Sequence, residues 1–285
     1  MLSRRAATLV EMLVAMALAT VVLSAATSSL FRQQRTHERT ASVARSEVQL
    51  RTATSVLANQ LSFLDAEAGD LAQGEVWDTA IQFRATVAIA LACDRTVGTV
   101  TFLPDPSGAV PLGGVASEPR PGDSLWFLGD SSWKGARIDA VAAVAATCPT
   151  PLASTGTVIR LTLGGSVDTI PALAPLRVTR PSRYSFYRSG DGTWQLGFRE
   201  WNEASGSFSA PQPVAGPFLR QADGRSSRFR YFDAEGSELA LNDGNAKRVA
   251  RIRVISHAPA SARERGQDSV RSDSLDVALQ RARAR

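Results

Sequence analysis

Residues 6–31 read AATLVEMLVAMALATVVLSAATSSLF, a stretch of apolar and small residues that carries a single charge, Glu11. From Met12 to Phe31 the chain has no charged residue at all, and about 20 such residues are enough for a helix to cross a bilayer. A short basic head, MLSRR at residues 1–5, precedes the stretch. The sequence therefore predicts a membrane-spanning helix close to the N-terminus.

The same helix is predicted to continue well beyond Phe31. The first glycine of the chain is Gly69 and the first proline is Pro104, so no strong helix breaker interrupts the segment that follows. Apolar residues recur in this segment every seven positions, with one further leucine beside them: Val43, Leu50, Leu57 and Leu64, and Leu61. This stripe predicts one helix from Ala7 to about Asp65, about 90 Å long at 1.5 Å per residue.

After residue 69 the hydrophobic period changes to two. Three stretches alternate apolar and polar residues: Ile81, Phe83 and Ala85; Trp194, Leu196 and Phe198; Leu275, Val277 and Leu279. Such alternation is typical of half-buried strands, and about ten strands are expected between residues 80 and 280. Turns are predicted at 190–192, 233–236 and 242–244, and loops at 104–122, 149–156 and 211–217. The predicted fold class is α+β: a long N-terminal transmembrane-plus-stalk helix whose C-terminal half packs on an antiparallel β-rich body.

Three interpretations of the N-terminal segment compete. Ser24-Ala25-Ala26 fits an ordinary signal peptide cut after Ala26, and Ser3-Arg4-Arg5 fits a twin-arginine signal. The third interpretation is a retained membrane helix behind a very short leader. Glu11 favours the third, because a carboxylate in an apolar helix is costly and marks a functional position when the helix is retained.

Residues 6–15, AATLVEMLVA, resemble the cleavage and methylation signature of type IV prepilins. The resemblance implies a cut between Ala6 and Ala7, makes Ala7 the N-methylated first residue of the mature chain, and makes Glu11 its fifth. The family normally has Gly before the cut and Phe after it, whereas this chain has Ala at both positions.

A second succession of segments is similar to PilW-type minor pilins and to J-type minor pseudopilins of type II secretion. Its parts are YSFY at 184–187, WQLGFR at 194–199, FRYFDAEG at 229–236 and RVARIRV at 248–254. The usual closing strand of that family, which ends in Arg-Asn, is not kept: the chain ends QRARAR at 280–285.

The resemblance implies a leader at 1–6, a transmembrane helix at 7–31, its amphipathic continuation at 32–68 and an extracytoplasmic body at 69–285. It further implies a non-enzymatic minor pilin or pseudopilin, anchored by a single pass in inner-membrane lipid with its body in the periplasm. Its expected partners are a prepilin peptidase, the inner-membrane assembly platform, and other minor and major pilins or pseudopilins. With these it would form the initiating or tip complex of a type IV pilus or a type II secretion pseudopilus, and reach the cell surface within the filament.

The rival interpretation is a secreted or anchored β-rich binding protein or enzyme, with a signal peptide cut after Ala26. Against an enzyme, the sequence has no Gly-x-Ser-x-Gly, phosphate-binding Gly-Lys-Ser/Thr or His-Glu-x-x-His motif, and no cofactor or small-molecule substrate is expected. We interpret the net charge of +5 as an arginine-rich solvated surface, because no run of five or six like charges occurs.

Cys93 and Cys148 are the only cysteines, and neither has a partner at metal-ligand spacing. They are expected to form a disulfide if the body is outside the cytoplasm, or to remain two free thiols if it is not. No metal site is predicted. We interpret His37 as a surface residue of the stalk, His257 as one at a strand end, and Asp233-Ala234-Glu235-Gly236 as a hairpin turn rather than a calcium loop.

Overall fold

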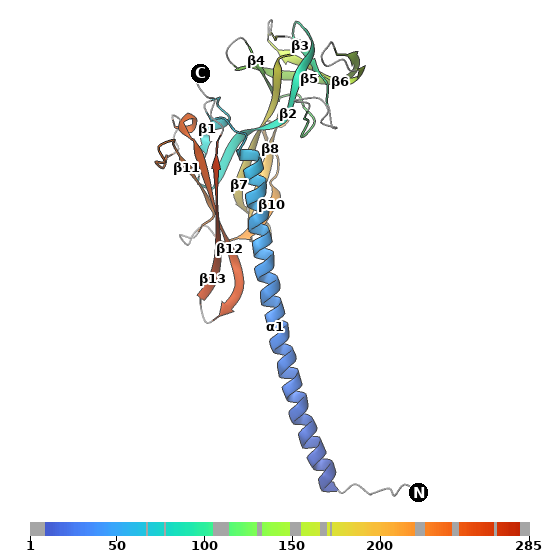
Figure 1. The fold of residues 1–285 in the computed structure, drawn as a ribbon, viewed down its shortest axis with the longest axis vertical. Helices are drawn as coiled ribbons and strands as arrows, with labels where there is room; N and C mark the ends of the chain where they lie inside the picture. Colours follow the sequence, from blue (N-terminus) through green and yellow to red (C-terminus); the bar gives the residue numbers. More distant parts are fainter. Residues whose placement is uncertain are drawn as a thin grey trace, which may run out of the picture.

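The computed structural model describes residues 9–66, 68–76, 78–104, 114–129, 133–148, 155–165, 170–171, 173–219, 226–240, 245–264 and 267–279. Within these stretches one long helix, α1 (Leu9–Leu61), precedes thirteen strands (Figure 1). The strands are β1 (Leu71–Val76), β2 (Ala80–Thr96), β3 (Thr99–Phe102), β4 (Ser124–Leu128), β5 (Trp133–Thr147), β6 (Thr155–Gly164), β7 (Pro175–Arg188), β8 (Trp194–Asn202), β9 (Ser207–Phe208), β10 (Gln212–Phe218), β11 (Arg228–Phe232), β12 (Arg251–Glu264) and β13 (Gln267–Ala278), with a 3-10 turn, η2 (Ala246–Arg248), before β12. All the pairings between these strands are antiparallel. A long N-terminal helix with a β-rich antiparallel body is the predicted α+β class.

Helix α1 has 53 residues, which corresponds to about 80 Å. It ends at Leu61, slightly before the predicted end near Asp65. The backbone N–H of Asp65 donates to the Asp70 carboxylate (2.9 Å), and the Asp65 carboxylate accepts from the N–H of Ala68 (3.1 Å). Side-chain acceptors of this kind compete with helical hydrogen bonds, and here they turn the chain toward β1.

The C-terminal half of α1 packs against β10, β12 and β13, and we call this part of the body the helix lobe. The predicted stripe faces its core: Leu50, Leu57, Leu61 and Leu64 are all buried. The side chain of Val43, the first member of the stripe, lies outside the described residues. Two polar contacts fix the same helix face, since the Tyr184 hydroxyl donates to the Gln60 amide oxygen (2.9 Å) and the Gly216 N–H to that of Gln49 (3.3 Å).

Two sheets form the walls of the helix lobe. One contains β1, the first part of β2, the last part of β7, β8 and β10, and the other contains β11, β12 and β13. Two backbone hydrogen bonds connect the sheets, from Phe229 N–H to Asp78 O (2.7 Å) and from Leu219 N–H to His257 O (2.8 Å).

A second lobe lies beyond the C-terminal end of α1 (Figure 1). Its strands pair in a closed ring, β2-β3-β6-β5-β4-β7 and back to β2, so we call it the barrel lobe. Closure requires β7 to pair on both sides, and Thr179 is opposite Thr86 of β2 and Ser124 of β4. A separate apolar core fills the ring, with Phe102, Leu125 and other residues fully buried. Strands β2 and β7 run through both lobes. The body is therefore continuous, although each lobe has its own apolar core.

Three local predictions were wrong or incomplete. The predicted loop at 211–217 is strand β10, which tolerates Pro213 and Pro217 because it lies at the edge of its sheet, where β8 is its one strand partner among the described residues. His257 lies within β12 rather than at a strand end. The last two residues of the predicted loop at 149–156 belong to β6, which begins at Thr155, and residues 149–154 lie outside the described residues.

The turns were predicted more accurately than the loops. The chain turns at 190–192 and 233–236 as expected, whereas 242–244 lies outside the described residues. The described residues hold twelve strands from β2 to β13, where about ten were expected.

Candidate membrane-anchoring site

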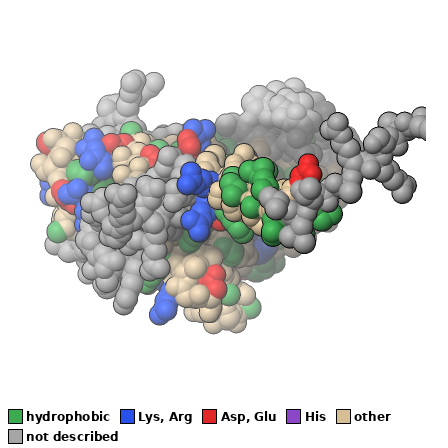
Figure 2. Space-filling model, turned by 90° about the horizontal axis from the view of Figure 1, so that it is seen from below, with side chains coloured by type: hydrophobic (Ala, Val, Ile, Leu, Met, Phe, Trp, Pro, Cys, Tyr) green, Lys and Arg blue, Asp and Glu red, His purple; other side chains and the backbone are tan. Residues whose placement is uncertain are grey.

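The N-terminal half of α1 is mostly apolar on all sides, and its residues 11–38 are exposed within the part of the chain that the structure describes. The segment Glu11–Glu38 has a mean hydropathy of 1.9, is long enough to cross a membrane, and has none of its most apolar window buried inside the protein. Its large apolar side chains are more than half exposed: Met12, Leu13, Val14, Met16, Leu18, Val21, Val22, Leu23, Leu30 and Phe31. Figure 2, seen from the helix end of the molecule, shows hydrophobic side chains gathered there. Leaving this surface in water costs about 25 cal/mol per Å², so it calls for lipid or other apolar helices around it.

The hydroxyl groups of this segment are compatible with a hydrocarbon environment. Each of four hydroxyls donates to a backbone carbonyl one turn earlier: Thr20 to Ala17 (2.8 Å), Ser24 to Val21 (2.8 Å), Thr27 to Leu23 (2.9 Å) and Ser28 to Ala25 (2.8 Å). A helix satisfies its own backbone, and these bonds satisfy the hydroxyl donors as well. The composition of the segment, rich in Ala, Ser and Thr, therefore does not prevent it from spanning a membrane.

Glu11 lies in the first turn of α1, with its side chain exposed. A carboxylate at this end of a helix is stabilised by the helix dipole, and in hydrocarbon it also requires a positive partner. Ala6 and Ala7, the predicted cleavage and methylation positions, lie outside the described residues. Of the predicted N-terminal site residues, Glu11 is therefore the one that lies within the described part of the chain.

Cys93 and Cys148 meet at the far end of the barrel lobe. Their sulfur atoms are 2.03 Å apart and their Cα atoms 5.0 Å apart, so the predicted disulfide pair is present. Both residues are buried, in a small cluster with Val158. The bond joins β2 to the end of β5, two strands that are not neighbours in the ring, and so it braces the barrel across its strands.

Two largely buried ion pairs, formed by arginine residues of β7, were not predicted from the sequence. The guanidinium of Arg180 on β7 donates twice to the carboxylate of Asp123 (2.8 and 2.9 Å), and both side chains are only 3% exposed. A second guanidinium on β7, that of Arg177, donates to Asp70 at 2.8 Å. Burial lowers the pKa of Arg180, but the hydrogen bonds and charge of Asp123 outweigh burial and the net shift is upward. The pairs are far apart in sequence, so no local motif announces them.

The remaining candidate residues of the sequence analysis lie apart from one another. The described residues contain no cluster of three or more His, Cys, Asp or Glu side chains that could hold a metal ion. His37 is exposed on α1. The carboxylates of Asp233 and Asp70 pair with arginine side chains rather than converging on one point. In comparisons with known proteins, no family model, no curated protein and no solved structure matches this chain.

Proposed function

We propose that this chain is a membrane-anchored, non-enzymatic subunit of a type IV pilin-like filament, a minor pilin or minor pseudopilin. The observation that carries the proposal is the continuity of α1. One helix supplies an apolar, fully exposed N-terminal half and a C-terminal half whose Leu57 and Leu61 are completely buried in the body. A targeting peptide that is removed by cleavage is not expected to form one continuous helix with residues buried in the core of the folded domain.

The same continuity suits a subunit that moves from a membrane into a filament. In the bilayer, lipid would cover the apolar half of α1. In a filament, the corresponding halves of neighbouring subunits would cover it instead, at little cost because both environments are apolar. The body would follow rigidly, since the hydrogen bonds of Gln49 and Gln60 fix the helix to β10 and β7.

Glu11 gives such an assembly its register. A cut after Ala6 would create a positive amine at Ala7, and that amine on one subunit could pair with the Glu11 carboxylate of a neighbour. Pairing removes two isolated charges from hydrocarbon, whereas misalignment leaves both uncompensated. Assembly would then depend on processing, because the peptidase creates the amine.

The test is Glu11→Gln in cells that carry the variant as their sole copy. We expect normal membrane insertion and cleavage, but poor co-purification with partner subunits and fewer filaments or less secretion. Glu38→Gln is the matched control, because it removes a carboxylate from the same helix at the far end of the apolar segment. Normal assembly of Glu11→Gln would contradict the docking role. Loss of cleavage would instead assign Glu11 to recognition by the peptidase.

A further inference from the structure

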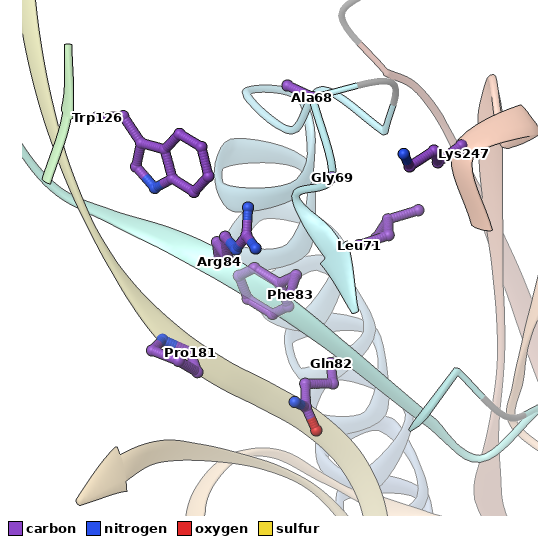
Figure 3. A pocket seen from close by; sticks show the side chains of 9 residues that line it. All are labelled: Ala68, Gly69, Leu71, Gln82, Phe83, Arg84, Trp126, Pro181 and Lys247. Carbon is purple, nitrogen blue, oxygen red and sulfur yellow. The ribbon is translucent and has the colours of Figure 1, made fainter. Parts of the chain in front are cut away.

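A pocket of about 450 Å³ opens where the two lobes meet the end of α1 (Figure 3). Its wall combines residues from six elements or connections: the turn after α1, β1, β2, β4, β7 and η2. The partly exposed Trp126 and Pro181 make part of the wall apolar, with the buried Leu71 and Phe83 beneath, and Arg84 and Lys247 bring two positive charges to it. The volume falls within the range of small-ligand sites, about 300–1,000 Å³.

Arg84 is held in place without an anionic partner of its own. Its guanidinium lies over the ring of Trp126, 4.6 Å from the ring centre, and its backbone N–H donates to Asp70 O (2.8 Å). The nearest described carboxylate in charge terms is Asp70, but that group bonds to Arg177 and to the N–H of Asp65. In the described part of the chain the Arg84 guanidinium donates no hydrogen bond and forms no ion pair. Burial is the main cause that lowers the pKa of Arg84, so its charged form lacks full compensation.

The stacking ring is itself fixed. The indole N–H of Trp126 donates to the Thr179 hydroxyl at 3.0 Å. Directly opposite on β5 stands Gly135, where a Cβ atom would come within 3.0 Å of the ring. The absence of a side chain at Gly135 therefore makes room for the indole, and the indole orients Arg84. A planar guanidinium held against an aromatic face presents its N–H edge in one direction, which suits bidentate recognition of a carboxylate.

Lys247 supplies the second charge from the opposite side of the pocket (Figure 3). It is exposed on η2 and, within the described residues, has no ion-pair partner, although its neighbour Arg248 pairs with Asp233. Counting Arg84, Lys247 and Arg177 against Asp70 and Asp65, these described groups around the junction carry three positive charges and two negative charges. The pocket thus carries a net positive charge next to apolar residues, a combination that favours an anionic ligand with an apolar group.

We propose that this pocket binds a carboxylate carried on an apolar group, with Arg84 as the bidentate donor and Lys247 as the second cation. Two sources share this chemistry: a free aromatic or aliphatic acid, and the C-terminal residue of another protein chain. The apolar group packs against Trp126 and Pro181, which are partly exposed, whereas Phe83 and Leu71 belong to the core beneath. The bound ligand joins β2 and β4 to η2, and so couples the barrel lobe to the sheet that holds α1. The inference does not depend on the proposed filament function.

The test is a calorimetric titration of the full chain in detergent with phenylacetate, referenced to protein-free micelles. We expect saturable binding at one site, and binding at least about tenfold weaker for the neutral isostere phenylacetamide, since a hydrogen bond to a charged group contributes that much. Arg84→Met should weaken phenylacetate binding about tenfold or more, and Lys247→Met by a few-fold. Lys134→Met is the matched control, because Lys134 is exposed on β5 away from the pocket, and it should bind like the unmodified chain.

Two further arms keep the test decisive. If Arg84→Met changes thermal unfolding, Arg84→Lys is used in its place. It retains the charge but not the planar fork, so an intermediate loss of affinity is expected.

The peptide Gly-Ser-Gly-Phe with a free carboxyl terminus is compared with its C-terminal amide and with phenylacetate. Tighter binding of the free peptide than of phenylacetate identifies a protein terminus as the source, and weaker binding identifies a free acid. No saturable binding in either acid arm, unchanged binding by both Arg84 variants, or equal binding of inorganic phosphate would overturn the proposal.

Discussion

The two halves of α1 differ in composition and have opposite surroundings. In the N-terminal half Met16 and Leu23 are 67% and 68% exposed, whereas in the C-terminal half Leu57 and Leu61 are 0% exposed. Both the number and the arrangement of the apolar residues differ. They are numerous and surround the first half of the helix, whereas the fewer apolar residues of the second half form a single stripe. Hydrophobicity and periodicity together thus divide one helix between a segment that needs an apolar solvent and a segment that needs one apolar wall.

The largest expected effect comes from placing the same charge in each half. Leu57→Asp buries an unpaired carboxylate and removes a core side chain, so the body should lose at least about 5 kcal/mol of unfolding free energy and fail to fold stably. Leu18→Asp should leave the unfolding of the body unchanged, but weaken membrane insertion by about 2.5–3.5 kcal/mol. All five tryptophans follow residue 70, so fluorescence during urea unfolding reports on the body alone.

Each variant is the control for the other. If Leu18→Asp destabilised the body as Leu57→Asp does, the exposed half of α1 would be packed in the native protein. If Leu57→Asp were tolerated, the helix would not be part of the core.

The helix could be predicted well because its signals are local. The spacing of Leu50, Leu57 and Leu64 fixes one face, and the distance to Gly69 fixes the length to within a few residues. The sequence left Cys93 and Cys148 as either a disulfide or two free thiols, and with only two cysteines no other pair within the chain was possible. Such features need no knowledge of which distant segments meet.

The barrel lobe could not be predicted, because its closure depends on pairings between strands far apart in the chain. Nothing in the sequence around Thr179 indicates that β7 pairs with both β2 and β4. Strand β10 was predicted as a loop because Pro213 and Pro217 indicate a break, and only its edge position makes them acceptable. Arg84 and Lys247 likewise meet at one pocket only through the tertiary fold.

A second effect distinguishes the barrel lobe from the helix lobe. Removing the disulfide with Cys93→Ala and Cys148→Ala frees a loop whose ends are 55 residues apart, which should cost about 4 kcal/mol in the chain-entropy model. The measurements are urea unfolding and amide hydrogen exchange. Exchange should accelerate first in the barrel lobe, while the backbone around Leu57 stays protected. A reductant should reproduce this effect in the unmodified chain and have none in the double variant; free thiols in the unreduced protein would contradict the pairing.

The smallest expected effect concerns the polar contact between α1 and β7. Tyr184→Phe removes the hydrogen bond to Gln60 and should cost about 1 kcal/mol, because the ring and its packing remain. Gln60→Met should cost a similar amount, and the double variant no more than either alone. Urea unfolding at pH 7 measures all three, and full additivity would show that the two residues do not act together.

The same tyrosine makes the helix lobe sensitive to alkali. Burial raises the pKa of Tyr184 well above its usual value, so the folded state holds the phenol neutral where the unfolded state would ionise it. Stability from this group is fully present below about pH 10 and decreases as the pH rises beyond that. Tyr231, whose pKa burial also raises, adds to the same loss. Unfolding between pH 9 and 11 should show a shallower decline for Tyr184→Phe, and an unchanged slope would indicate that Tyr184 is accessible to water.

The central claim, that both halves of α1 remain together in the mature protein, is tested most directly by the intact mass and N-terminal sequence of the chain extracted from washed membranes. We expect a chain that begins at Ala7, with or without an added methyl group, that is released by detergent but not by alkaline carbonate. A carbonate-soluble chain that begins at Thr27 would mean that a signal peptidase had cut within α1 after Ala26, and would contradict both the anchor and the filament subunit built on it.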